Sequence, residues 1–221
     1  MNPWLLVAAA YLWGAIPAAY IAGRLVKGID LRRHGSGNLG ATNTFRVLGA
    51  KVAAPVMVFD ILKGFLPTHF FQHWDSSPAW EWALAYGVAA IVGHVFSIYM
   101  RFRGGKGVAT GAGVFLALAP LAVGVGLLVW LVVLRATRMV SAGSVSAALV
   151  VALLLLLTPV EREVQLLGLG IALFIVFAHR GNLGRIARGE EPRFGGPRPA
   201  HPDEAAVGAA AVTADAEDPT A

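Results

Sequence analysis

Long apolar segments separated by short basic loops are the feature of this sequence that most constrains its fold. Crossing about 30 Å of hydrocarbon takes a helix of roughly 20 mostly apolar residues. Five segments meet or approach this length: about 4–23, 52–72, 80–99, 142–158 and 163–179. The chain is also 57% hydrophobic and only 14% charged, which is too apolar for a soluble domain of this size. The sequence therefore predicts an all-α integral membrane protein.

The stretch 107–135 decides the number of spans. As a single helix rising about 1.5 Å per residue, it would be too long for one crossing and short for two. Pro120 divides the stretch, and a proline in a helix interior removes a hydrogen bond and clashes with the preceding turn. Two short spans, 107–119 and 120–135, bring the total to seven transmembrane helices.

The positions of Lys and Arg favour this count. With seven spans, 16 of the 18 basic residues lie on one side of the membrane, and only Lys63 and Arg162 do not. With one span fewer, Arg135 and Arg138 separate from the basic tail. Because cytoplasmic loops carry an excess of Lys and Arg, the sequence predicts an N-terminus outside and a C-terminus in the cytoplasm.

The two ends of the chain are interpreted from composition. The first segment, Trp4 to Ala22, lacks a basic n-region, so we expect a retained span rather than a signal peptide. Residues 195–221 are rich in Pro, Ala, Gly and acidic residues, which predicts a disordered cytoplasmic tail without chemistry. Residues 1–194 then form one membrane domain.

Several classes of chemistry are disfavoured. The chain has no cysteine, so it can form no disulfide and has no thiol nucleophile. Its carboxylates and histidines show no ligand spacing, so no metal site is expected. The net charge of +5 in a membrane protein fits anionic lipid or an anionic substrate better than nucleic acid.

Three basic, glycine-containing loops are the candidates for function. The first spans 32–43 and contains Gly35, Ser36, Gly37, Asn38 and Asn43. Its glycines match a dinucleotide-binding fingerprint formally, but no strand precedes them, so that interpretation is rejected. Glycines allow close backbone approach, and short polar side chains bind anions or cap a helix. The alternative is a simple turn and N-cap before the second span.

The second loop holds Gly104, Gly105, Lys106 and Gly107. It resembles half of a P-loop, but no Ser or Thr follows the lysine, so a Walker A motif is rejected. We expect a nest of backbone N–H groups at the start of the next helix, which would bind a phosphate together with Lys106. The alternative is a basic anchor for anionic lipid.

The third loop follows the last span and contains His179 and Asn182. Their spacing places both on one helical face if the helix continues. Ser141 and Ser144 begin the sixth span, where capping is their simplest role. His94 near the end of the third span fits a packed, hydrogen-bonded histidine. Asp60 and Lys63 within the second span predict a structural ion pair, with support of the site as the alternative.

These motifs resemble the bacterial acyl-phosphate:glycerol-3-phosphate acyltransferase family over about residues 4–195. The resemblance rests on Gly35 to Asn43, on Gly93 to Phe96 with Arg103 to Thr110, and on His179 to Asn182 with Gly189-Glu190. Three departures from the family pattern are Leu39 and Ser97, where the family usually has Pro, and Gly181, where it more often has a charged residue.

The resemblance implies seven spans and a cytoplasmic active site in the bacterial inner membrane. It implies that the sn-1 hydroxyl of glycerol 3-phosphate attacks a fatty acyl phosphate, giving 1-acyl-glycerol 3-phosphate and inorganic phosphate. Ser36, His179 and Asn182 are the expected catalytic residues. Expected phosphate-binding residues are Arg46, Lys106, Ser144, Ser141, Asn38, Asn43, Gly104, Gly105 and Gly107. We expect a monomer in contact with membrane lipids, without a cofactor.

The residues fit this chemistry. Because an acyl phosphate is already activated, no nucleophilic triad is needed, and none is evident around His179. Proximity and stabilisation of the developing oxyanion would then do most of the work. The base is either His179 or, as we favour, an oxygen of the donor phosphate. A transporter or exchanger for a phosphorylated solute is the main alternative, and a non-catalytic scaffold that binds anionic lipid is a third.

Overall fold

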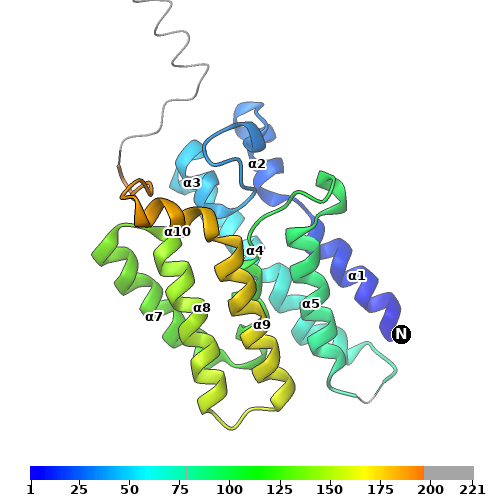
Figure 1. Cartoon of the computed structure of the whole chain (residues 1–221). Coiled ribbons are helices and arrows are strands. Elements are labelled where there is room, and N and C mark those ends of the chain that lie inside the picture. The colour runs from blue at the N-terminus through cyan, green and yellow to red at the C-terminus, as the bar shows by residue number, and fades with distance from the viewer. Residues whose placement is uncertain (78, 197–221) are drawn as a thin grey trace, which may run out of the picture.

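The computed structural model describes residues 1–77 and 79–196, and all regular structure within these ranges is helical (Figure 1). The long helices run side by side: α1 (Pro3–Ala15), α4 (Ala50–Phe70), α5 (Trp82–Val95), α6 (Val108–Leu118), α7 (Pro120–Thr137), α8 (Val140–Leu157) and α9 (Arg162–Ala178). Short helices add to these: α2 (Ala18–Lys27), α3 (Ala41–Leu48) and α10 (Arg180–Ala187), with 3₁₀ turns η1 (Leu31–Arg33), η2 (Phe71–His73) and η3 (Ile98–Met100). Most of the expected tail, 197–221, lies outside the described residues.

A helix lies in each of the seven segments expected to span the membrane. Four helical stretches are long and apolar enough to cross by length and composition, or five if α9 and α10 count as one bent span. Helix α6 is short, with 11 residues, and α4 carries Asp60 and Lys63. The count of seven spans therefore stays a prediction, while the helical class is confirmed.

Two expected helices are interrupted. The first segment breaks at Ile16 and Pro17, between α1 and α2, because proline lacks the N–H that a continuous helix needs there. The last segment ends at Ala178, and α10 leaves α9 at an angle of 56°. Helix α9 does not continue through the third loop, so the condition under which His179 and Asn182 would share one helical face is not met.

Glycines bring the first half of the bundle into close contact. A Cβ on Gly14 of α1 would overlap the backbone of Ala90 in α5, and one on Gly64 of α4 would overlap the Thr110 carbonyl in α6. Gly113 of α6 meets the Ile61 carbonyl in the same way. Small residues of this kind let helices approach closely in lipid, where packing rather than water exclusion drives association. The pairs α1–α5 and α4–α6 are thus fixed backbone to backbone.

The outer surface is apolar, as a lipid-facing surface should be. Leu121 and Leu157 are 86% and 72% exposed, and Val132 is 67% exposed. A core cluster of Phe115, Leu155 and Val164 joins α6, α8 and the start of α9. Large apolar side chains on the outer surface fit a protein whose solvent is hydrocarbon.

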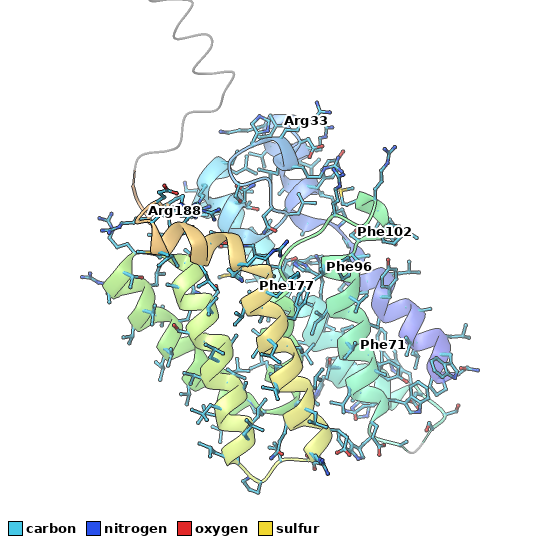
Figure 2. The ribbon with its side chains drawn as sticks, viewed as in Figure 1. Arg33, Phe71, Phe96, Phe102, Phe177 and Arg188 are labelled. Atoms are coloured by element: carbon cyan, nitrogen blue, oxygen red, sulfur yellow. The ribbon has the colours of Figure 1, made fainter. Side chains whose placement is uncertain are left out.

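The two ends of the bundle differ. Near the start of α1, Trp4 and Trp82 pack edge to face with ring centroids 5.1 Å apart. Aromatic side chains of this kind mark a membrane interface. Helices α2, α3 and α10 gather at the opposite end with the basic loops (Figure 1). Arg33 and Arg188 project there, whereas Phe71 lies toward the aromatic end (Figure 2).

Candidate active site

The second and third basic loops meet in a buried polar network. The Lys106 ammonium donates a hydrogen bond to the Asn182 amide oxygen, and the Asn182 amide nitrogen donates to Glu191 Oε1 at 2.7 Å. Ser141 of α8 donates to the same carboxylate oxygen at 2.7 Å, and Arg185 Nε donates to Oε2 at 2.8 Å. Side chains of α8 and α10 therefore converge on Glu191, which is 5% exposed, and Lys106 joins them through Asn182.

Sequence reasoning missed Glu191. It follows Glu190 in a basic segment, and nothing in the sequence separates the two carboxylates. The structure does, because Glu190 pairs with Arg188 on the exposed surface while Glu191 turns inward. Burial alone would raise the pKa of Glu191, but hydrogen bonds from Ser141, Asn182 and Arg185 hold it below its usual value. The network thus centres on an ionised carboxylate.

Cations outnumber this carboxylate. Burial is the main cause that lowers the pKa of half-buried Lys106 to about 8; the nearby charges of Arg185 and Arg46 also lower it, and Glu191 raises it. Burial likewise lowers the pKa of Arg46, which lies on α3, and the charges of Glu191 and Arg185 act on it. Arg46, Lys106 and Arg185 thus face one carboxylate, which leaves an excess of positive charge suited to an anion such as phosphate.

His179 lies at the bend between α9 and α10 and is 4% exposed. Its Nδ1 lies 2.8 Å from the Ile175 carbonyl oxygen. Because a carbonyl only accepts, the proton of the neutral ring sits on Nδ1. That arrangement leaves Nε2 as the ring atom able to meet a substrate.

The first loop is organised by Asn43 rather than open to a ligand. The Asn43 amide oxygen accepts from the Ser36 N–H at 2.9 Å, and its nitrogen donates to the carbonyls of Leu31 and His34 at 3.2 and 3.0 Å. Gly35 and Gly37 supply the positive φ angles, 60° and 71°, that the turn needs. Asn43 is 1% exposed, and its amide protons are all used. Asn43 is thus a loop-forming residue in this structure, and its expected contact with a phosphate remains a prediction.

Ser36 itself is exposed, and Asn38 is half-buried. Within residues 1–77 and 79–196, no hydrogen bond joins either of them to the Lys106–Asn182–Glu191 network. Stacking of Phe45 on Phe194, with ring centroids 4.6 Å apart, connects α3 to the segment after Glu191. Arg46 on α3 therefore lies near the network, while Ser36 and Asn38 lie on the first loop and are not bonded to it.

The second loop also differs from the expected nest. The Gly104 N–H donates to the Val95 carbonyl at 2.9 Å, and the Gly105 N–H donates to the His94 carbonyl at 3.1 Å. These two groups fasten the loop to the end of α5, and the expected phosphate contact of Gly104 and Gly105 remains a prediction. Gly107, with φ of 78°, is the N-cap of α6. Lys106 and the first N–H groups of α6 remain as the anion-binding part of the loop.

Ser141 does not cap α8. Met139 is the N-cap of that helix, and the Ser141 hydroxyl donates to Glu191 instead. Its only proton is therefore used, so Ser141 supports the carboxylate in this structure, and its expected contact with a phosphate remains a prediction. Ser144 lies one turn further along α8 and is 6% exposed. Its expected contact with a phosphate remains a prediction.

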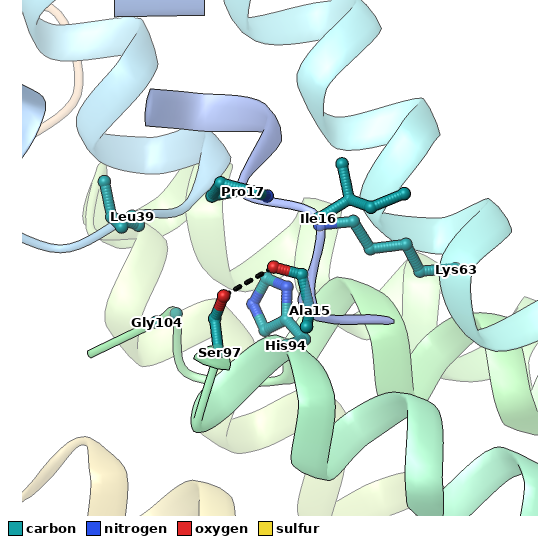
Figure 3. A pocket seen from close by; sticks show the side chains of 9 residues that line it. Ala15, Ile16, Pro17, Leu39, Lys63, His94, Ser97 and Gly104 are labelled. Atoms are coloured by element: carbon teal, nitrogen blue, oxygen red, sulfur yellow. Dashed lines mark hydrogen bonds between the residues drawn. The ribbon is translucent and has the colours of Figure 1, made fainter. Parts of the chain in front are cut away.

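A second buried polar group lies beneath the second loop. The predicted ion pair between Asp60 and Lys63 is confirmed at 2.7 Å, and His94 Nδ1 lies 3.6 Å from the same Asp60 oxygen. Lys63 and His94 line a small pocket with Ser97, whose hydroxyl donates to the Ala15 carbonyl at 2.5 Å (Figure 3). Leu39, the other position at which the family usually has proline, is buried with Ala19 and Val56. Both departures are thus accommodated by packing.

Comparison with known proteins agrees with this arrangement. The family model described as glycerol-3-phosphate acyltransferase matches residues 4–189. A glycerol-3-phosphate acyltransferase of Synechococcus elongatus is 43% identical over 192 residues, covering 84% of this chain and 91% of the relative. Glycerol-3-phosphate acyltransferase 3 of Bacillus anthracis is 42% identical over 195 residues, covering 87% and 96%.

Two solved structures share the fold. One is the crystal structure of PlsY (YgiH), an integral membrane glycerol 3-phosphate acyltransferase, in its glycerol 3-phosphate form. It aligns with a TM-score of 0.81 and 37% identity over 87% of this chain and 96% of its own. The lysophosphatidic acid form aligns with a TM-score of 0.79 and 36% identity over 87% and 95%.

Fold and site together define a multi-pass helical membrane protein with a cationic site at one end of its bundle. The extent of the matches also makes it an acyltransferase. The chain belongs to the glycerol-3-phosphate acyltransferase family.

Proposed function

We propose that this protein transfers a fatty acyl group from an acyl phosphate to the sn-1 hydroxyl of glycerol 3-phosphate. The observation that carries the proposal is the network in which Lys106 and Asn182 meet over Glu191, with Arg46 and Arg185 beside it. It offers excess positive charge at one end of the bundle, where two phosphate-bearing substrates need it. The relatives named for glycerol 3-phosphate support the acceptor.

The reaction forms one ester bond and breaks one anhydride bond. The acceptor oxygen attacks the acyl carbonyl carbon, and the bond from that carbon to the phosphate oxygen breaks. The products are 1-acyl-glycerol 3-phosphate and inorganic phosphate. Lys106, Arg46 and the N-terminus of α6 hold the phosphates, which positions the reactants and stabilises negative charge as it develops.

Asn182 acts here through Lys106. Because its nitrogen is held by Glu191, its oxygen is presented to the Lys106 ammonium and fixes where that charge lies. Ser141 and Arg185 fix Glu191 in turn. Ser144 and Ser36 are proposed to reach a phosphate once the substrates are bound.

The hydroxyl proton passes to an oxygen of the donor phosphate. His179 Nε2 is the alternative acceptor, since Nδ1 is held by Ile175. The neighbouring charge of Lys106 opposes a second positive charge on the ring, which favours the phosphate oxygen. Under this proposal His179→Gln retains a substantial part of the turnover, whereas a histidine base would make that variant inactive.

The test is turnover by purified protein in detergent or a lipid mesophase with palmitoyl phosphate and glycerol 3-phosphate. Release of inorganic phosphate that depends on both substrates is expected. No release in any lipid condition would contradict the proposed reaction. Efficient turnover with acyl-CoA would contradict the donor assignment. Uptake of glycerol 3-phosphate into proteoliposomes without ester formation would instead support a transporter.

We also propose a monomer in the bacterial inner membrane with the site facing the cytoplasm and the N-terminus outside. The sequence contains no cysteine, so single cysteines can be introduced without background. A cysteine in place of Ser76 should react with an impermeant maleimide from outside the cell. A cysteine in place of Arg188 should react only after the membrane is opened, and the reverse pattern would invert the orientation.

A further inference from the structure

Three ionisable side chains are buried directly beneath the second glycine loop. Asp60 and Lys63 lie on α4 and are each 2% exposed, and His94 lies in the last turn of α5 and is 7% exposed. The Lys63 ammonium donates to Asp60 Oδ1 at 2.7 Å, and His94 Nδ1 faces the same oxygen at 3.6 Å. None of the three belongs to the Glu191 network, so the proposed reaction leaves them without a role.

His94 touches the loop through both its backbone and its ring. Its carbonyl accepts from the Gly105 N–H, and the next carbonyl, that of Val95, accepts from the Gly104 N–H. A Cβ on Gly104 would overlap the His94 carbonyl, and a Cβ on Gly105 would overlap His94 Nε2. The ring therefore forms the floor on which Gly105 rests, one residue before Lys106.

The end of the loop that leads into α6 is fixed to α4, the helix that carries Asp60 and Lys63. Lys106 and Gly107 lead into α6, and Gly113 of α6 packs on the Ile61 carbonyl of α4. Gly64 of α4, next to Lys63, packs on the Thr110 carbonyl of α6. Helix α4 thus sets one end of the loop through Asp60 and His94, and the other end through its contact with α6.

Packing alone does not call for charges at this place. Ionised side chains inside a membrane are costly, and a buried ion pair is often no more stabilising than apolar residues of similar volume. What the charged group adds is direction, because the Asp60 carboxylate lies 3.6 Å from His94 Nδ1 and favours an N–H on that side of the ring, while Nε2 lies against Gly105. An apolar residue would fill the space without fixing that orientation.

We propose that His94, oriented by the Asp60–Lys63 ion pair, is a positioning residue that sets the place of Lys106 in the phosphate site. It does not touch substrate. A displaced Gly105 would move the Lys106 ammonium relative to Asn182 and to a bound phosphate. The proposal rests on the proposed function, since it needs Lys106 to hold a phosphate.

The test compares kinetic constants of His94→Ala with those of Lys106→Ala and of His73→Ala, a matched control in the exposed turn η2 at the aromatic end. His94→Ala is expected to lower kcat/KM by up to about a hundredfold, because the Lys106 ammonium would be misplaced. His73→Ala should match the unaltered protein. His94→Asn, which retains a polar atom near Nδ1, should recover part of the loss.

A double variant separates positioning from folding. If His94 acts through Lys106, adding His94→Ala to Lys106→Ala should lower the affinity for glycerol 3-phosphate, measured by titration calorimetry, no further. Additive losses in the double variant would overturn the proposal. So would a His94→Ala protein whose KM is unchanged and whose turnover falls only with its folded fraction.

Replacing both charges provides the second arm. Asp60→Leu combined with Lys63→Met removes the pair without leaving one charge buried alone, so the fold should be retained. A raised KM in this variant supports the proposal, and an unchanged KM overturns it. If Lys106→Ala has normal kinetics, the phosphate role of Lys106 fails, and that result is distinct from a failure of His94 alone.

Discussion

The first and second basic loops solve the same problem in different ways. Each contains glycines, and each is held in place by a buried polar residue. In the first loop the Asn43 side chain, on the helix that follows directly, forms the hydrogen bonds. In the second loop the backbone carbonyls of His94 and Val95, at the end of α5, accept them, and the His94 ring lies between Gly105 and Asp60 of α4. The conformation of the first loop therefore depends on residues close to it in the sequence, whereas the position of Lys106 in the second loop depends on how α4, α5 and α6 pack.

The largest expected effect comes from removing the charge that the second loop carries. Lys106→Ala should lower kcat/KM by about 10²–10³, since it deletes a charged donor from a partly buried anion site. Lys51→Ala removes an exposed charge at the start of α4 and should leave kcat/KM unchanged. Steady-state phosphate release with both substrates measures the difference. Equal effects of the two substitutions would mean that Lys106 contributes only general surface charge.

Glu191→Gln tests the point where the second and third loops meet. It weakens bonds to Ser141, Asn182 and Arg185, and hydrogen bonds to a charged group contribute about 1.5–3 kcal/mol each. A lower thermal unfolding temperature and a raised KM are expected, with exposed Glu190→Gln as the matched control. Equal stability of the two variants would remove Glu191 from the centre of the site.

This carboxylate also predicts a pH dependence of stability. Since hydrogen bonds hold the pKa of Glu191 below its ordinary value of 4.5, its contribution is complete at neutral pH. The contribution is lost as the pH falls through the folded-state pKa. The acid limb of the unfolding temperature should therefore flatten in Glu191→Gln.

Asn43→Ala should break the first loop without disturbing the second. Buried groups left without a partner cost about 1–3 kcal/mol each, so the free energy of unfolding should fall by an amount of that order. Hydrogen exchange should accelerate over 31–43 and stay unchanged over 104–107. Equal acceleration in both segments would show that the conformations of the two loops are coupled.

The smallest effect concerns the proton on Lys106. Burial lowers the pKa of this lysine to about 8, so the free enzyme loses its charge as the pH rises through that value. The value of kcat/KM should therefore be about twofold lower at pH 8 than its plateau at lower pH, and fall further above it. In Lys106→Arg the alkaline limb should move to higher pH, because arginine stays charged. An identical limb in both proteins would assign it to another group.

Helices and loops were predictable from local patterns. Apolar length gave the long helices, Pro120 divided α6 from α7, and the spacing of Asp60 and Lys63 gave their ion pair. The bond between Lys106 and Asn182 joins the second and third basic loops. The site roles beyond that contact remain predictions.

What could not be predicted depends on partners far apart in the chain. Glu190 and Glu191 look alike in sequence, and only the fold turns one of them inward. Ser141 has the sequence position of a cap, but its hydroxyl donates a hydrogen bond to Glu191. Gly104 and Gly105 look like a phosphate nest, but their N–H groups donate hydrogen bonds to carbonyls at the end of α5. In each case the hydrogen-bond or ion-pair partner of the group comes from the fold and is not evident from the neighbouring sequence.

The ion pair of α4 has a consequence for how the protein enters the bilayer. A lone Asp or Lys at the middle of an inserting helix costs about 2.5–3.5 kcal/mol. Asp60 and Lys63 lie three residues apart on one helix, so the pair can close as soon as that turn forms. Helix α4 therefore carries its own counter-ion during synthesis and needs no later segment to neutralise it. His94 emerges afterwards and finds a preformed partner.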